Sequence, residues 1–468
     1  MLFNSISFLF LFLPVAVIVY YIAPDRAKNG VMLAASILFY AWGEPVYVVL
    51  LVLSVLLNYF AGRDIGAKLE DPRRARLAVA FGVAANVAIL AFFKYYGFLI
   101  SQINLLLPEE IPYRELSVPL GLSIFTLQEI SYLVDVYRGK AQVQKNPVNF
   151  ALYAAMFPQI LAGPVVRYSD MERQLEKRSV TARKAGQGAM LFITGLAKKA
   201  ILSNSLGKVF EQVAAMPTGS ISALTAWIGC FSFALQIYFE FSGWSDMARG
   251  LARMFGFEFR KNFEHPYISR SITEFWRRWN ISLVTWFREY VYLPMGGNRG
   301  TVSRNIFNMM VVWILTGMWH GASWNFIVWG VYCGIILVME KYVWGESLDH
   351  LPGPVRRIYF IVLTLVGWVF FFSPSLGYSL RYLTAMIGAG AGFVDGEGGF
   401  LLLTHWLLYL AAAAAATPLA KAFAGQIMGI SGNLRVRTAV TVTLYIGIFL
   451  VSAAFLVTDT YNPFLFRF

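Results

Sequence analysis

The chain has 468 residues, of which 58% are apolar or aromatic and only 14% are charged. A typical soluble domain is about 45–50% apolar and about 25% charged, so this composition excludes a soluble domain of this size, a disordered chain and a disulfide scaffold. The formal net charge is +13. The basic residues lie between long uncharged runs, which is typical of loops flanking membrane helices rather than of nucleic-acid binding.

Apolar stretches long enough to cross a bilayer recur along the whole chain. A helix needs about 20 apolar residues to span the hydrocarbon core. The first stretch has no basic residue ahead of it, so we interpret it as a retained helix and not as a signal peptide. The pattern predicts an all-α, polytopic membrane protein with roughly 11 to 13 transmembrane or re-entrant helices. Uncharged runs cover 1–24, 146–166, 221–239, 305–339, 358–380, 398–420 and 438–458; single charges interrupt 31–61 (Glu44), 77–107 (Lys94) and 116–134 (Glu129), and two lysines interrupt 185–205.

The charges of the loops predict an orientation. The loop 62–76 is basic, 108–115 is acidic and 138–145 is basic again. Because cytoplasmic loops are enriched in Lys and Arg, we expect 62–76 and 138–145 in the cytoplasm and 108–115 outside. The basic stretches 167–184 and 249–304 should also be cytoplasmic.

Eight basic residues with interleaved aromatic residues lie within 260–304. Phe275, Trp279, Leu283 and Trp286 recur at helical spacing, so residues 273–293 predict an amphipathic helix along the cytoplasmic interface. One interpretation is an anchor on anionic membrane lipids. The other is a basic, aromatic mouth for a phosphorylated donor such as coenzyme A, because the arginine side chain can bind two phosphate oxygens at once.

The run 305–339 is too long for one membrane helix. As a straight helix it would measure about 52 Å, whereas the bilayer core is about 30 Å thick. The run must therefore break, and Gly317 and Gly321 offer the place. His320 lies between them, deep in the membrane, where an ionisable residue indicates a functional site. The residues alone leave two roles open, a structural hydrogen bond or a base that activates a hydroxyl.

Other candidate residues give weaker signals. His265, His350 and His405 are interpreted as turn, loop or interfacial residues, and Cys230 and Cys333 as buried core residues. The spacing of histidines, cysteines and acids suggests no metal site, and no Gly-x-Ser-x-Gly or His-Glu-x-x-His motif occurs.

Several long motifs together resemble those of the membrane-bound O-acyltransferase family. They are RKNFEHPYISRSITEFWRRWNISLVTWFREYVYLPMGGNR at 260–299, Trp-His-Gly at 319–321, and the segments 119–139, 157–168 and 236–257. The bacterial branch of the family, with its alginate O-acetyltransferases and D-alanyl transferases, is the most similar. The resemblance covers residues 1–468 as one domain, with a core motif region at about 117–345. It implies a ring of helices around a thin centre that opens to the cytoplasm through a funnel.

The resemblance also implies site residues. His320 corresponds to the essential histidine of the family. The family motif Trp-Arg-Arg-Trp-His-x-Ser-Leu is matched at 276–283, where Asn280 replaces the histidine. Asparagine is no base, so the implied role of Asn280 is to orient the donor or the acceptor. The residues expected to bind the phosphates and pantetheine of acetyl-CoA are Arg277, Arg278, Trp279, Arg288 and Arg299.

The activity that the resemblance implies is membrane O-acetylation. Acetyl would pass from cytoplasmic acetyl-CoA, through the bacterial inner membrane, to an extracellular or periplasmic polysaccharide with the help of an SGNH-type partner. The C-terminal segment 461–468 is similar to a segment that carries the acyl group in D-alanylation, so Tyr461 or a partner residue is the expected relay. Two alternatives remain: acyl or D-alanyl transfer to a teichoic acid or lipid, and a transporter without chemistry. A transporter would more typically place carboxylates in mid-membrane, and the long uncharged runs hold none.

Overall fold

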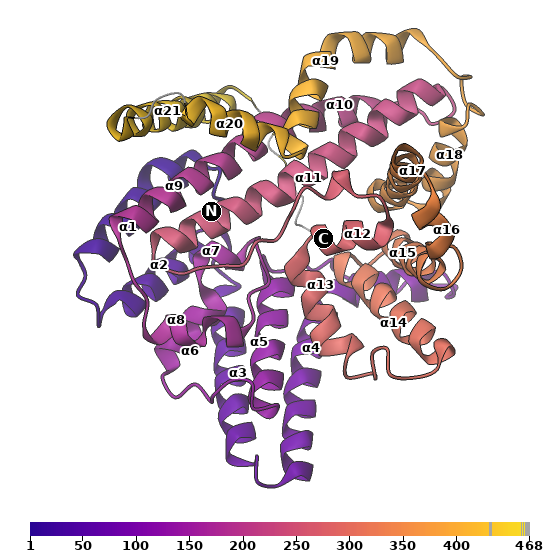
Figure 1. The fold of residues 1–468 in the computed structure, drawn as a ribbon. Coiled ribbons are helices and arrows are strands. Elements are labelled where there is room, and N and C mark those ends of the chain that lie inside the picture. The colour runs from indigo at the N-terminus through magenta and orange to yellow at the C-terminus, as the bar shows by residue number, and fades with distance from the viewer. Residues whose placement is uncertain (430–432, 460, 462, 464–468) are drawn as a thin grey trace.

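The computed structural model describes residues 1–429 and 433–459 together with Tyr461 and Pro463. All regular structure in these residues is helical, which confirms the all-α prediction (Figure 1). The N-terminal third contains the π-helix η1 (Phe8–Phe12), α1 (Leu13–Ile22), α2 (Lys28–Gly43), α3 (Val48–Ala67), α4 (Pro72–Asn104), α5 (Leu122–Tyr137), α6 (Pro147–Ala155), α7 (Phe157–Ile160) and α8 (Tyr168–Glu176). Local sequence sets these boundaries: the Asp71 carboxylate accepts hydrogen bonds from the amides of Arg73 and Arg74, and Pro72 begins α4.

The longest buried helix, α11 (Ala223–Met254), runs through the middle of the molecule, and α9 (Ala182–Ala197) packs alongside it in the opposite direction. Glycines allow the two backbones to touch. A Cβ atom on Gly188 would lie 2.6 Å from the carbonyl oxygen of Gly250, and one on Gly195 would lie 2.5 Å from that of Gly243. Small residues spaced in this way are the usual means by which membrane helices pack closely. The π-helix η2 (Lys198–Ser203) and α10 (Asn204–Ala214) continue α9 along the same face of α11.

The segment predicted as one amphipathic helix over 273–293 is broken, so that prediction was wrong. It consists of α12 (Ile272–Arg278), α13 (Ile281–Phe287) and the π-helix η4 (Arg288–Tyr292), after a short 3-10 helix η3 (Pro266–Ile268). The break lies at Asn280, whose φ of 43° no α-helix can contain. Phe275, Trp279 and Trp286 are buried inside the protein and do not form a lipid-facing stripe. The apolar periodicity continues across the break because both short helices bury an apolar face, α12 in one hydrophobic cluster and α13 in another.

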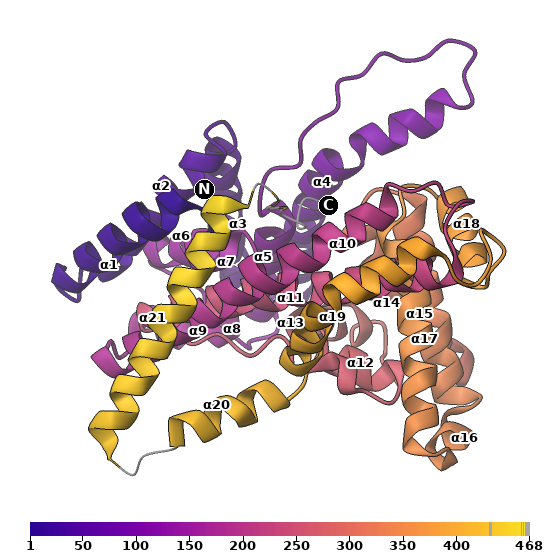
Figure 2. The ribbon, with the colours of Figure 1, turned by 90° about the horizontal axis from the view of Figure 1, so that it is seen from above.

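The remaining helices follow in the C-terminal part of the chain. They are α14 (Val302–His320), α15 (Trp324–Tyr342), α16 (Gly345–His350), α17 (Gly353–Phe372), α18 (Leu376–Met386), α19 (Gly396–Ala416), α20 (Leu419–Gly429) and α21 (Leu434–Thr458). Figure 2 shows α1 and α2 at one side and α15 and α17 at the other, with α11 between them. α3, α4 and α5 project together from this body (Figure 1).

Seven helices in the described part of the chain are long and apolar enough to cross a membrane: α3, α4, α11, α15, α17, α19 and α21. The protein is therefore a multi-pass membrane protein, as predicted. Other predicted segments are present as shorter or interrupted helices. For example, 146–166 forms α6 and α7, separated at Met156, and 185–205 passes from α9 into η2 and α10. Such short and interrupted helices account for the larger number expected from sequence.

Candidate functional site

The predicted break in the run 305–339 is present, and His320 lies at it. α14 ends at His320 and α15 begins at Trp324, so the run folds back as a helical hairpin. Gly317 and Gly330 let the two helices meet: a Cβ atom on Gly317 would lie 2.2 Å from the carbonyl oxygen of Phe326. The hairpin thus brings the last residue of α14 into the interior of the protein, where His320 is 6% exposed.

The imidazole of His320 is surrounded by aromatic rings. The ring centroids of Trp319, Trp329 and Phe371 lie 5.0, 5.1 and 5.2 Å from its own. Such apolar surroundings accommodate an uncharged imidazole far better than a charged one. A neutral imidazole has one nitrogen able to accept a proton, which is the property required of a general base.

Helix α4 anchors the turn that carries His320. The Lys94 ammonium donates a hydrogen bond to the carbonyl oxygen of Trp319, and the Tyr95 hydroxyl donates to that of Met318. These carbonyls belong to the last turn of α14, where backbone acceptors have no partner within the helix. Residues about 225 positions apart in sequence therefore hold the His320 turn in place.

Asn280 lies in the break between α12 and α13, and Asn262 holds it there. The Asn262 side-chain amide donates to Asn280 Oδ1 at 3.0 Å, while Asn262 Oδ1 accepts from the Ser282 amide at 2.9 Å. Asparagine and histidine are among the few non-glycine residues that adopt a positive φ readily. The backbone conformation therefore explains why an asparagine can stand where the family motif has a histidine.

Two cavities meet at His320 and Asn280, which line both. We name the cavities by the predicted orientation. The outer cavity, about 310 Å³, extends toward the segment that precedes α5. The inner cavity, about 120 Å³, extends toward η4. The outer cavity is lined by Glu44, Lys94, residues 117–124, Leu161, Phe241 and Trp319, and the inner one by Trp276, Trp279, Leu283, Val284, Phe287, Arg288, Tyr292, Val312, Trp313 and Thr316.

The residues predicted to bind the donor separate into two groups. Trp279 and Arg288 line the inner cavity together with His320. Trp279 is buried and packs against Phe275 and Trp368. Arg288 also lines the inner cavity, but its side chain is exposed. Arg277, Arg278 and Arg299 do not line either cavity. Arg278 is paired with the Glu274 carboxylate at 2.9 Å, and Arg277 and Arg299 are exposed.

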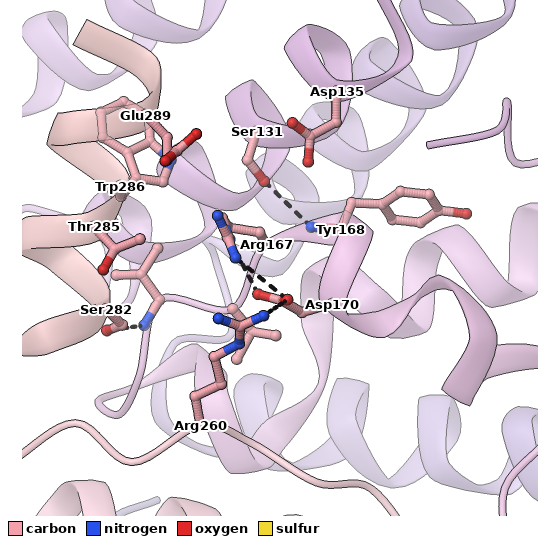
Figure 3. A network of polar contacts seen from close by, with 12 residues as sticks. Ser131, Asp135, Arg167, Tyr168, Asp170, Arg260, Ser282, Thr285, Trp286 and Glu289 are labelled. Carbon is pink, nitrogen blue, oxygen red and sulfur yellow. Dashed lines mark hydrogen bonds and ion pairs between the residues drawn. The ribbon is translucent and has the colours of Figure 1, made fainter. Parts of the chain in front are cut away.

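Polar contacts hold α13 in place on the side away from the inner cavity (Figure 3). The Ser282 hydroxyl accepts a hydrogen bond from the Val165 amide at 2.8 Å. Asp170 lies between two arginines, at 3.0 Å from Arg167 Nε and 2.6 Å from an Arg260 terminal nitrogen. The Ser282 contact connects α13 to the loop before α8. Asp170 of α8 connects that loop, through Arg167, to the segment before α12, through Arg260.

Tyr461, expected as an acyl relay, does not line either cavity. Its hydroxyl accepts a hydrogen bond from Gln236 Nε2 at 3.2 Å and lies against Gly207. Nearby, Asp459 pairs with Lys208 at 2.7 Å, and the fully buried pair Lys199–Glu240 is also 2.7 Å apart. The rest of the expected relay segment, Asn462 and 464–468, lies outside the described residues.

The other histidines lie away from the cavities. His265, which also has a positive φ, places Nδ1 3.2 Å from the carbonyl oxygen of Ala416, and His405 is on α19. Within the described ranges, no group of three or more histidine, cysteine and acidic side chains is arranged to hold a metal ion.

The sequence analysis assigned no role to most of the residues that line the two cavities. Trp276, Tyr292, Trp313 and Thr316 line the inner cavity because helices distant in sequence converge there. Lys94 was visible as the single charge in an apolar stretch, but its position beside His320 depends on how α4 packs against α14. A lone charge in a membrane segment was thus the one available signal.

Comparison with models of protein families identifies the family of this chain. The model of the membrane-bound O-acyltransferase family matches residues 80–346, more than half of the chain, including Lys94, Asn280 and His320. The chain belongs to this family. The predicted resemblance is thereby confirmed, and every residue that lines the two cavities of this membrane-bound O-acyltransferase except Glu44 lies within the matched region.

Individual relatives agree with this assignment. The O-acyltransferase is 38% identical to the probable alginate O-acetylase of Azotobacter vinelandii over 83% of its own chain and 79% of that protein. It is 34% identical to the peptidoglycan O-acetyltransferase of Helicobacter pylori, over 83% and 80% of the two chains. Similarity to the teichoic acid D-alanyltransferase of Bacillus subtilis is lower, with 26% identity over 53% and 65% of the two chains.

Proposed function

We propose that this O-acyltransferase transfers acetyl from cytoplasmic acetyl-CoA to a hydroxyl on the outer side of the bacterial inner membrane, for O-acetylation of a polysaccharide. The observation that carries the proposal is that His320 and Asn280 line both an inner and an outer cavity. A donor and an acceptor entering from opposite sides would meet there. The relatives named as O-acetylating enzymes support acetyl as the group transferred.

The donor would enter through the inner cavity. Arg288 at its end is placed to meet a phosphate group, and the aromatic wall that includes Trp279 suits the pantetheine arm. The thioester would then reach His320. Arg277 and Arg299, exposed outside the cavity, are left to attract the anionic nucleotide from a distance, and the ion pair with Glu274 makes Arg278 a weaker candidate.

The proposed reaction is a direct acyl transfer with His320 as the base. The imidazole takes the proton of the acceptor hydroxyl while the hydroxyl oxygen attacks the thioester carbonyl carbon. The carbon–oxygen bond forms, the carbon–sulfur bond then breaks, and the imidazolium returns the proton to the leaving thiolate. The products are the acetyl ester and coenzyme A, and His320 is regenerated. Asn280 serves to orient one of the reactants, because an amide cannot take up the proton.

The acceptor that enters the outer cavity is proposed to be a hydroxyl of a partner protein of the SGNH type, which then acetylates the polysaccharide. The outer cavity is bounded by Glu44 and residues 117–124, on the side predicted to face outward. A cavity of about 310 Å³ has room for a side chain or a sugar residue but not for a polymer. A relay is therefore needed, either a partner residue or, after movement of the C-terminal segment, Tyr461.

The first prediction concerns His320 itself. In purified protein supplied with labelled acetyl-CoA and a hydroxyl acceptor, His320→Ala and His320→Gln should lower acetyl transfer by about 100-fold or more, because general-base catalysis contributes about 10²–10⁴-fold. His350→Ala, a change in an exposed helix end, is the matched control and should retain the full rate. Undiminished transfer by the His320 variants would refute the proposal.

Competition assays separate the alternative donors. Unlabelled acetyl-CoA should suppress transfer of the label, whereas carrier-bound D-alanine should not. Suppression only by D-alanyl donors would favour the D-alanyl alternative, and transport of polymer without release of coenzyme A thiol would favour the transporter.

A further inference from the structure

Lys94 is a buried cation in a helix that otherwise suits lipid. It is the one charged residue between Arg76 and Glu109, and its side chain is only 7% exposed. α4 turns many apolar side chains outward, Phe81 and Leu99 among them. A lysine at such a place costs free energy unless a polar cavity or partner receives it, so its presence points to a function.

Among the described residues, the contacts of Lys94 include a hydrogen bond but no ion pair. In the part of the chain that the structure describes, no carboxylate forms an ion pair with it. Its contacts are the hydrogen bond to the carbonyl oxygen of Trp319 and the face of the Trp319 ring, whose centroid is 5.7 Å from Nζ. An ammonium group has three donors, and the Trp319 carbonyl uses one of them.

The outer cavity leaves space in which the remaining N–H groups of the Lys94 ammonium can bind a reactant. Lys94 lines the outer cavity together with His320, and the carbonyl to which it is bonded belongs to the residue directly before His320. The ammonium is therefore held beside the catalytic imidazole by the same turn that positions it. Negative charge appears in this region during acyl transfer, on the carbonyl oxygen, once the acceptor oxygen has bonded to the acetyl carbon.

From this juxtaposition we infer that Lys94 is a catalytic residue whose ammonium binds the oxyanion formed at the acetyl carbonyl. The inference rests on the proposed function. The bonds made and broken are those of the proposed transfer: the oxyanion forms as the acceptor oxygen adds, Lys94 keeps its proton, and the carbonyl is restored when the thiolate leaves. Preorganised donors of this kind act strongly where water is excluded.

The experiment compares Lys94 with its neighbour Tyr95. Tyr95 donates to the same turn, through the carbonyl of Met318, but does not line the outer cavity. Lys94→Gln removes the charge and keeps a donor group, Lys94→Arg keeps the charge, and Tyr95→Phe removes only a contact to the turn. Acetyl transfer and release of coenzyme A are measured at varied acetyl-CoA concentration, with the melting temperature of each purified variant.

Lys94→Gln should lower kcat by about 10²–10³-fold, the loss typical of removing one oxyanion donor, with little change in the KM for acetyl-CoA. Lys94→Arg should recover at least tenfold of that loss, and Tyr95→Phe, which removes one contact to the His320 turn, should lose at least tenfold less activity than Lys94→Gln. The inference is overturned if Lys94→Gln turns over at the wild-type rate, or if Tyr95→Phe loses as much as Lys94→Gln.

If Lys94→Gln does not fold, Lys94→Arg decides, since a folded but inactive arginine variant would also overturn the inference. The proposed function has a separate outcome: full activity of His320→Ala would remove the basis of both. Full activity of Lys94→Gln beside an inactive His320→Ala would remove only the role of Lys94.

Discussion

At the scale of single residues, the backbone position of each site residue limits which side chains can stand there. His320 is the last residue of a helix, and Asn280 has a positive φ that excludes most other residues. Lys94 contacts the turn from another helix. Each residue is thus defined by its backbone position as well as by its chemistry, and substitutions must separate the two.

Substitution of Asn280 can make that separation. Asn280→Gly keeps the backbone conformation but removes the amide, whereas Asn280→Ala removes the amide and adds about 1–2 kcal/mol of strain from the left-handed conformation. Both variants remove the acceptor of the Asn262 hydrogen bond. If the amide orients a reactant, both should lose transfer activity, and Asn280→Ala should lose more thermal stability than Asn280→Gly. Activity and melting temperature measured on the same preparations test this, and a fully active Asn280→Gly would show that the amide has no role.

At the scale of elements, the hairpin of α14 and α15 places His320 in the interior of the protein. Its close packing depends on Gly317, because a Cβ atom there would lie 2.2 Å from the carbonyl oxygen of Phe326. Backbone cannot move aside as a flexible side chain can. The position of His320 therefore depends on a glycine three residues before it, which has no reactive group of its own.

Gly317→Ala should force α14 and α15 apart. We expect a loss of about 1–3 kcal/mol in stability, the usual cost of overpacking, together with reduced acetyl transfer because His320 is displaced. Gly447→Ala in α21 is the matched control, since no heavy atom lies within 4 Å of its added Cβ, and it should be neutral or slightly stabilising. Equal melting temperatures and activities for the two variants would contradict this view of the hairpin.

The sequence correctly predicted a feature that depends on a single segment of the chain. The break at Gly317–Gly321 follows from the length of one uncharged run. The sequence did not predict features that depend on contacts between two segments distant in the chain. The helix over 273–293 looked continuous because the conformation of Asn280 depends on Asn262 and the surrounding core. The contact of Lys94 with the Trp319 carbonyl could not be foreseen for the same reason.

At the scale of the whole molecule, the account requires a defined orientation. The inner cavity must open toward the cytoplasm, where acetyl-CoA is found, and the outer cavity toward the opposite side. The basic stretch 62–76, which covers the end of α3 and the start of α4, and the acidic stretch 108–115 lie at opposite ends of α4. This arrangement is the expected one if the positive-inside rule applies, and the orientation itself stays a prediction.

Single cysteines can test the orientation. Glu110→Cys should react with a membrane-impermeant maleimide in intact spheroplasts, whereas Arg74→Cys should react only after the membrane is opened. Both positions are exposed, and the native Cys230 and Cys333 are buried, so background labelling should be low. The reverse pattern of labelling would place the inner cavity on the wrong side for a cytoplasmic donor.

The most direct test of the central claim is a structure of the wild-type protein with bound coenzyme A. The claim is that the two cavities meet at His320 and that the donor reaches it from the inner one. The account predicts the thiol beside the His320 imidazole, with the pantetheine arm along Trp279 and a phosphate near Arg288. A thiol that ends in the outer cavity without passing His320, or outside both cavities, would contradict the account.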